Sequence, residues 1–158
     1  MEQKIVQNVL LYKFRNMKKI GLLVMLLVSS IGFSQNWKSS LEEAKIEAAK
    51  ENKQILLVFS GSDWCAPCMK LEKNIWKSEA FKKEADEKYV LIKADFPKKK
   101  ANQLSAELTE NNKKLAEKYN KEGNFPLVVK LDKNGKVKGM TGFKNVSAEQ
   151  YVKLLNSL

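Results

Sequence analysis

The chain contains two cysteines, Cys65 and Cys68, in the sequence Trp64-Cys65-Ala66-Pro67-Cys68. A bridge between them closes a very small loop, so it gives the fold little of the entropic stabilisation that a bridge across a long loop provides. Thiols at this spacing are suited to exchange instead: one thiolate attacks a disulfide, and the second resolves the mixed disulfide that forms. The cysteine pair therefore predicts redox chemistry rather than a structural disulfide.

A metal site is the chemical alternative for the two thiols. Structural zinc takes four ligands. This chain offers two cysteines and no histidine, so a zinc site would need ligands from a second chain. The absence of histidine also excludes a Ser-His-Asp triad and a Cys-His nucleophile. We expect no metal and no dissociable cofactor, with Cys65 and Cys68 themselves as the catalytic groups.

The elements around the pair place it at the junction of a strand and a helix. The continuous apolar run 55–59 predicts a strand buried on both faces, and residues 65–77 have helical spacing. Cys65 then lies at the helix N-terminus, where backbone N–H groups and the helix dipole favour a thiolate. Pro67 fixes the start of this helix. Trp64 either shields the pair and offers an apolar surface to a substrate, or is an ordinary core residue.

The remaining pattern predicts a single α/β domain. Helices are expected over 41–50, 78–88, parts of 97–122 and from 147 onward, and strands over 89–95, 126–131 and 136–140. Residues 40–43 and 147–150 are capping boxes, and Ile46 and Met69 are expected on apolar helix faces. Asn134-Gly135 predicts a hairpin turn. Helices between strands imply parallel crossovers, and the hairpin adds an antiparallel edge.

Residues 55–70 resemble the active-site strand, loop and helix of thioredoxin-like proteins, especially exported bacterial members. They are similar to the C-terminal domain of the transporter DsbD. The resemblance covers most of residues 37–158 and implies a thioredoxin fold, a three-layer α/β/α arrangement around a central mixed sheet. It also implies that Cys65 is the exposed sulfur, which attacks a substrate disulfide or receives attack when the pair is oxidised. Cys68 would be the buried sulfur that resolves the mixed disulfide. The implied partners are protein thiols or disulfides and a membrane or exported redox partner.

The sequence Asn124-Phe125-Pro126-Leu127 precedes the penultimate strand, where thioredoxin-like proteins carry a cis-proline that faces the cysteines. The resemblance gives this role to Pro126, and it makes Phe125 the residue whose backbone pairs with an extended substrate. Together with Trp64 and Pro67 these residues would form the substrate groove. The alternative is an ordinary trans-proline at the start of a strand.

The chain departs from the family pattern in three places. The aspartate that many members bury beneath the cysteines falls at Val58, so no proton acceptor for Cys68 is apparent. The loop before Cys65 is one residue longer than in thioredoxin, and its Asp63 is expected to be solvent-exposed and not to act as the base. The charged segment 97–122 is also longer than its counterpart.

The N-terminus has the pattern of an export signal. Basic residues within 13–19 precede an apolar run over 20–28, and small residues follow. We expect a signal peptide over 1–34, with Met17 as an alternative start, and a domain over 35–158 that is exported to the periplasm or the extracellular space. The apolar run is short for a transmembrane helix, and an uncleaved membrane anchor is the alternative.

The charge distribution argues against nucleic-acid binding. The chain has a formal net charge of +11, and without the first 34 residues it retains 24 basic and 17 acidic residues. The lysines are scattered, with no basic stripe of interleaved aromatic residues that would stack on bases. We expect a monomer. The sequence leaves the direction of electron flow open, and its resemblance to thioredoxin and DsbD favours disulfide reduction over oxidation. The rival hypothesis is a binding or chaperone-like module that uses the same fold without turnover.

Overall fold

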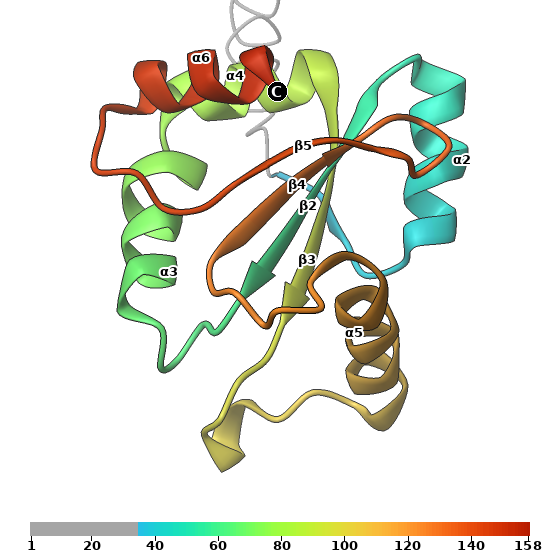
Figure 1. Ribbon diagram of the computed structural model, residues 1–158, viewed down its shortest axis with the longest axis vertical. Helices are drawn as coiled ribbons and strands as arrows, with labels where there is room; N and C mark the ends of the chain where they lie inside the picture. The colour runs from blue at the N-terminus through green and yellow to red at the C-terminus, as the bar shows by residue number, and fades with distance from the viewer. Residues whose placement is uncertain (1–34) are drawn as a thin grey trace, which may run out of the picture. The chain divides into compact units, whose positions relative to one another are not determined.

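The computed structural model describes residues 35–158; the expected signal peptide over 1–34 lies outside the described residues. Its centre is a five-stranded sheet in the order β1-β3-β2-β4-β5 (Figure 1). The strands are β1 (Trp37–Lys38), β2 (Gln54–Ser60), β3 (Tyr89–Asp95), β4 (Leu127–Leu131) and β5 (Val137–Thr141). β1, β2 and β3 run parallel to one another, whereas β4 is antiparallel to both β2 and β5. The predicted thioredoxin fold with a mixed sheet is confirmed.

Helices cover both faces of this sheet. The helical elements are α2 (Leu41–Glu51), α3 (Ala66–Leu71), the π-helical turn η2 (Glu72–Trp76), α4 (Glu79–Lys88), the 3-10 turn η3 (Lys100–Asn102), α5 (Ala106–Tyr119) and α6 (Ala148–Ser157). α2 and α5 pack on one face of the sheet, and α3, η2, α4 and α6 pack on the other. Within residues 35–158 no helix is long and apolar enough to cross a membrane.

β2 lies at the middle of the sheet and is buried on both faces. Leu57 and Phe59 pack with α2 and α5, while Leu56 and Val58 pack with the helices of the opposite face. Burial on both faces explains why the strand is apolar without alternation. Its C-terminal end leads directly into the turn that carries the cysteines.

Helix termini follow the sequence signals closely. Ser147 and Gln150 form the complete expected capping box at the start of α6. At α2 the Ser40 hydroxyl accepts the Glu43 N–H, which is one half of the box predicted there. The side chain of Ile46, expected on the apolar face of this helix, is 72 % exposed. That expectation is wrong, because Ala44 and Ala48 make the contact with the sheet and Ile46 lies on the opposite side of the helix.

Two further features differ from the expected pattern. β1 was not predicted, since a two-residue strand is too short to show a hydrophobic period. The helix expected over 65–77 is an α-helix that changes to π-helical geometry at Glu72. Met69 was expected to face inward but is exposed, because Leu71, Ile75 and Trp76 fill the core beneath this helix.

Candidate redox site

Cys65 and Cys68 form a disulfide at the junction of β2 and α3, with an S–S distance of 2.03 Å and a Cα–Cα distance of 5.2 Å. Cys65 is the N-cap residue of α3, and its sulfur accepts the backbone N–H of Cys68 at 3.2 Å. Pro67 lies in the first turn of the helix, where its missing N–H costs no hydrogen bond. An amide donor aimed at Cys65 favours negative charge on this sulfur.

Burial does not distinguish the two cysteines in this oxidised form. Cys65 is 4 % exposed and Cys68 is 3 % exposed, although Cys65 was expected to be the exposed sulfur. Because the two sulfurs are bonded to each other, they share one environment. What distinguishes the two sulfurs is the hydrogen bond that Cys65 accepts from the amide of Cys68. In residues 35–158 no group of three or more His, Cys, Asp or Glu side chains is placed to hold a metal ion.

Trp64 lies at the surface beside the pair, and 38 % of the residue is exposed. It is therefore not an ordinary core tryptophan. Its indole N–H donates to the carbonyl oxygen of Phe96 at 2.7 Å, and its ring meets Phe125 edge-on, with 5.3 Å between ring centroids. Phe125 also contacts the ring of Phe96 at 5.5 Å. Three aromatic rings from three separate loops therefore pack together next to Cys65.

Gly61 makes the position of Trp64 possible. A Cβ atom on this glycine would lie 2.3 Å from Cε2 of Trp64, well inside contact distance. The carbonyl oxygen of Gly61 also accepts the N–H of Cys65 at 2.9 Å. No sequence pattern gives Gly61 a role, because the contact depends on where the indole ring lies in the folded protein.

The peptide bond between Phe125 and Pro126 is cis, as the family resemblance implied. Pro126 is buried immediately before β4, and Phe125 is partly buried. β4 pairs with β2, and Leu127 lies opposite Phe59 near the C-terminal end of β2. The turn at Phe125 and Pro126 therefore lies at the same end of the sheet as the disulfide. Of the residues assigned to the groove, Trp64 and Phe125 are in direct ring contact, while Pro67 lies between the cysteines in the sequence.

An ion pair lies one helical turn beyond Cys68. Lys93 is the register partner of Val58 on the neighbouring strand, and its Nζ bonds to the Glu72 carboxylate at 2.7 Å. The Glu72 N–H in turn donates to the carbonyl oxygen of Cys68. The sequence shows no apparent proton acceptor for Cys68, so this ion pair was not predicted. Two signals were available: the spacing of four residues between Cys68 and Glu72, and a lysine within an apolar strand.

Asp63 has a structural role that was not anticipated. Expected to be exposed, it is partly buried. Its carboxylate accepts the N–H groups of Lys98 and Lys99, both at 2.9 Å, and the side-chain amide of Asn102 at 3.0 Å. The hydrogen bond from the Lys98 N–H is the main reason why the pKa of Asp63 lies below its ordinary value. The carboxylate therefore holds the segment that follows β3 against the active-site loop.

Comparison with known proteins agrees with this geometry. A family model described as thioredoxin-like matches residues 36–133. The chain belongs to the thioredoxin-like family. It is 34 % identical over 121 residues to the disulfide bond reductase DsbH of Chlamydia pneumoniae, an alignment that covers 77 % of this chain and 70 % of that protein.

Solved structures extend the comparison. A DsbH oxidoreductase superposes with a TM-score of 0.72 at 33 % identity, over 78 % of this chain and 83 % of that one. The reduced C-terminal domain of Neisseria meningitidis DsbD gives a TM-score of 0.52 at 21 % identity, over 74 % and 92 % of the two chains, which is a likeness of fold. Homology to DsbH supports thiol–disulfide oxidoreductase activity for this chain.

Proposed function

We propose that this protein is an exported disulfide reductase in which Cys65 is the attacking thiol and Cys68 the resolving thiol. The observation that carries the proposal is the hydrogen bond from the Cys68 N–H to the Cys65 sulfur at the start of α3. This amide stabilises charge on Cys65 when the pair is reduced. The relationship to a disulfide bond reductase supports the direction of electron flow.

The proposed thiol–disulfide exchange proceeds in two steps. The Cys65 thiolate attacks one sulfur of a substrate disulfide; a bond from Cys65 to substrate forms, the substrate S–S bond breaks, and the departing thiolate takes a proton. Cys68 then loses its proton and attacks the Cys65 sulfur, which releases the second substrate thiol. The substrate gains two electrons, and the pair ends as the disulfide seen here. A membrane or exported thiol donor must reduce the pair again.

Glu72 is our candidate for the group that accepts the proton from Cys68. A helical side chain leans toward the turn that precedes it, and for Glu72 that turn contains Cys68. Lys93 binds the carboxylate at 2.7 Å and limits its motion. This pair would take the place of the aspartate that many relatives carry where this chain has Val58.

The substrate groove is assigned to Trp64, Pro67, Phe125 and Pro126. The exposed part of Trp64 offers an apolar contact next to Cys65. The turn at Phe125 and Pro126 lies at the same end of the sheet, where the Phe125 backbone would pair with an extended substrate segment. Residues 1–34 are proposed to direct export, which would place the protein where disulfides persist. The mass of the protein recovered from the periplasm tests cleavage after Ser34.

Trapping the mixed disulfide tests the chemistry. The Cys68→Ser variant should accumulate a covalent adduct with a disulfide substrate, and Cys65→Ser should form none. Both variants should lose catalysis of insulin reduction. If insulin reduction by dithiothreitol proceeds at the same rate with the wild type and with both variants, a non-catalytic binding module is favoured instead. Equilibration with glutathione tests direction: a potential as oxidising as about −120 mV would contradict a reductase.

A further inference from the structure

A short basic segment follows β3 and extends from the active-site end of the molecule. We call residues 97–102 the lysine arm; it contains Lys98, Lys99 and Lys100, whose side chains are all exposed. β2 and β3 are parallel, so the arm and the cysteine turn leave the sheet at the same end. Figure 1 shows this segment at the lower end of the molecule, beside the loop that joins β2 to α3.

Side-chain hydrogen bonds hold the base of the arm against the active-site loop. The Asp63 carboxylate accepts the backbone N–H groups of Lys98 and Lys99, and the Trp64 indole donates to Phe96. Ser62 adds a further link through its N–H and hydroxyl, which both donate to the Asp95 carboxylate. The residues directly before Cys65 thus fix the position of the arm. Lys98 and Lys99 are held by their backbone N–H groups, so their ammonium groups take no part in these hydrogen bonds.

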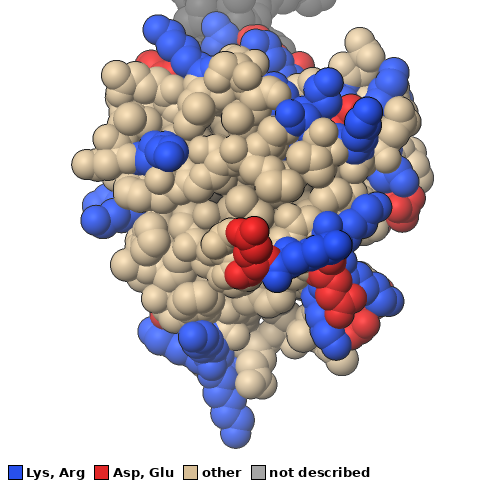
Figure 2. Space-filling view, in the orientation of Figure 1, with Lys and Arg blue, Asp and Glu red and all other residues tan. Residues whose placement is uncertain are grey.

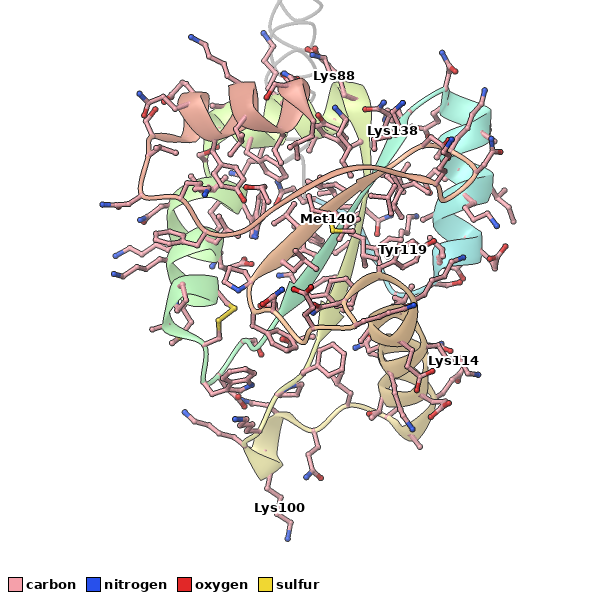
Figure 3. All side chains as sticks on the ribbon, viewed as in Figure 1. Lys88, Lys100, Lys114, Tyr119, Lys138 and Met140 are labelled. Carbon is pink, nitrogen blue, oxygen red and sulfur yellow. A yellow bond between two sulfur atoms is a disulfide. The ribbon has the colours of Figure 1, made fainter. Side chains whose placement is uncertain are left out.

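The three ammonium groups have no carboxylate partner in the described part of the chain. None of its ion pairs includes Lys98, Lys99 or Lys100. Lys98 instead places its Nζ 4.1 Å from the centroid of the Trp64 ring. Basic side chains project from this end of the molecule in Figure 2, and Figure 3 labels Lys100 at its tip. Asp63 and Asp95 offset part of this charge, but both carboxylates already accept internal hydrogen bonds.

We propose that the lysine arm is a docking surface for an acidic polypeptide segment that flanks the disulfide to be reduced. The proposal rests on the proposed reductase function, since the partner must bring its disulfide to Cys65. Carboxylates on the partner bind Lys98, Lys99 and Lys100, while an apolar side chain beside its cysteine contacts Trp64. Complementary charge raises the rate of encounter, and salt screens it.

Two disulfide-linked peptides test the docking proposal. They share the same residues around the cysteine, but the flanking residues are acidic in one peptide and basic in the other. At low salt kcat/KM should be about 3- to 10-fold higher for the acidic peptide, and the ratio should approach one as about 500 mM salt screens the charges. The triple variant Lys98→Gln/Lys99→Gln/Lys100→Gln should remove most of the preference. Its matched control is Lys133→Gln/Lys136→Gln/Lys138→Gln, which removes three exposed lysines around the β4–β5 hairpin. Figure 3 shows Lys138 far from Lys100.

Two additional measurements separate failure of this proposal from failure of the proposed function. Reduction of the uncharged hydroxyethyl disulfide reports the chemistry alone: normal reduction with equal rates for both peptides overturns the docking proposal. An acidic peptide with serine in place of cysteine reports binding without turnover. Saturable shifts of the Trp64 indole NMR signal that the arm variant loses support the docking proposal, even if no turnover occurs. Absence of shifts, or equal shifts in both triple variants, overturns it.

Discussion

Lys93 bonds to Glu72 at 2.7 Å and brings an ion pair from β3 to the helix turn that follows Cys68. Lys93 also lies over the Trp37 ring, with its Nζ 4.7 Å from the ring centroid, so contacts on two sides hold it. The pair is only partly buried, so water can reach the Glu72 carboxylate. The place of Glu72 one helical turn after Cys68 supports the proposal that its carboxylate receives the Cys68 proton.

Glu72→Gln should slow the second step of exchange. The amide cannot accept the Cys68 proton, so we expect the mixed disulfide to decay about tenfold or more slowly at about pH 7. Raising the pH should restore the rate, since hydroxide then deprotonates Cys68 without help. Stopped-flow measurement of mixed-disulfide decay separates this step from the initial attack by Cys65, which should change little.

Glu110→Gln is the matched control for this experiment. Glu110 also pairs with a lysine, Lys114, but on α5 and at 3.9 Å. This variant should behave as the wild type at every pH. Unchanged decay in Glu72→Gln, or equal slowing in both variants, would remove Glu72 from the mechanism.

Apart from β1, the order of the helices and strands and the cysteine pair were predictable because their signals are local. The apolar run of β2, the Cys-x-x-Cys spacing and the capping box at Ser147 are each contained within a few consecutive residues. The cis-proline came from the family resemblance. In these cases the short-range pattern and the tertiary structure agree.

The features that were missed depend on contacts between distant segments. The Glu72 and Lys93 pair joins a helix to a strand 21 residues later, and Asp63 binds the Lys98 amide 35 residues away. Neither contact follows a sequence period. The spacing of Cys68 and Glu72 and the lysine in an apolar strand single out these positions, but only the folded arrangement brings Glu72 and Lys93 together. The prediction for Ile46 was wrong for a related reason. Its helix has apolar residues on both sides, and packing against the sheet decides which side is buried.

Gly61→Ala should displace Trp64. A Cβ would lie 2.3 Å from the indole ring, so either the ring or the loop must move. We expect a loss of about 1–3 kcal/mol in the free energy of unfolding, together with lower activity toward protein disulfides. Urea denaturation and insulin reduction measure the two effects.

A double-mutant cycle checks the cause of this loss. In a Trp64→Ala background the added methyl group meets no ring, so the cost of Gly61→Ala should largely disappear. An equal cost in both backgrounds would show that backbone effects, and not the indole contact, require glycine at this position.

Stability should fall at alkaline pH because of buried tyrosines. Burial raises the pKa of Tyr89 to about 12, from an ordinary value of 10.0, and burial also raises the pKa of Tyr151. Below pH 10.0 Tyr89 keeps its hydroxyl proton in both the folded and the unfolded protein. As the pH rises toward 12, the unfolded protein releases this proton while the folded protein retains it. In this range each tyrosine should lower the free energy of unfolding by about 1.4 kcal/mol per pH unit.

Tyr89→Phe isolates this contribution. Urea unfolding at about pH 9 and about pH 11 should show a smaller loss of stability in the variant than in the wild type. The remaining loss would come chiefly from Tyr151. Identical losses in the two proteins would show that Tyr89 does not retain its proton in the folded state.

Asp63 should make the position of the lysine arm pH-dependent. Hydrogen bonds, chiefly from the Lys98 N–H, hold the pKa of Asp63 below its ordinary value near 3.8, so the folded state favours the carboxylate. The contribution of the Asp63 carboxylate to folding stability is complete above its ordinary pKa. This contribution is lost as the pH falls through the lower pKa of the folded state. The amide NMR signals of Lys98 and Lys99 should therefore move together in acid.

Asp63→Asn should produce part of this change at neutral pH. The amide keeps a single acceptor oxygen where the carboxylate accepts three donors, so hydrogen exchange at the amides of Lys98 and Lys99 should become faster. Asp86→Asn, on the exposed side of α4, removes the same charge away from the arm and should leave this exchange unchanged. If the proposed docking surface depends on a fixed arm, Asp63→Asn should also lower the preference for acidic peptides, although all three lysines remain. A preference equal to that of the wild type would show that the charges act without a fixed position.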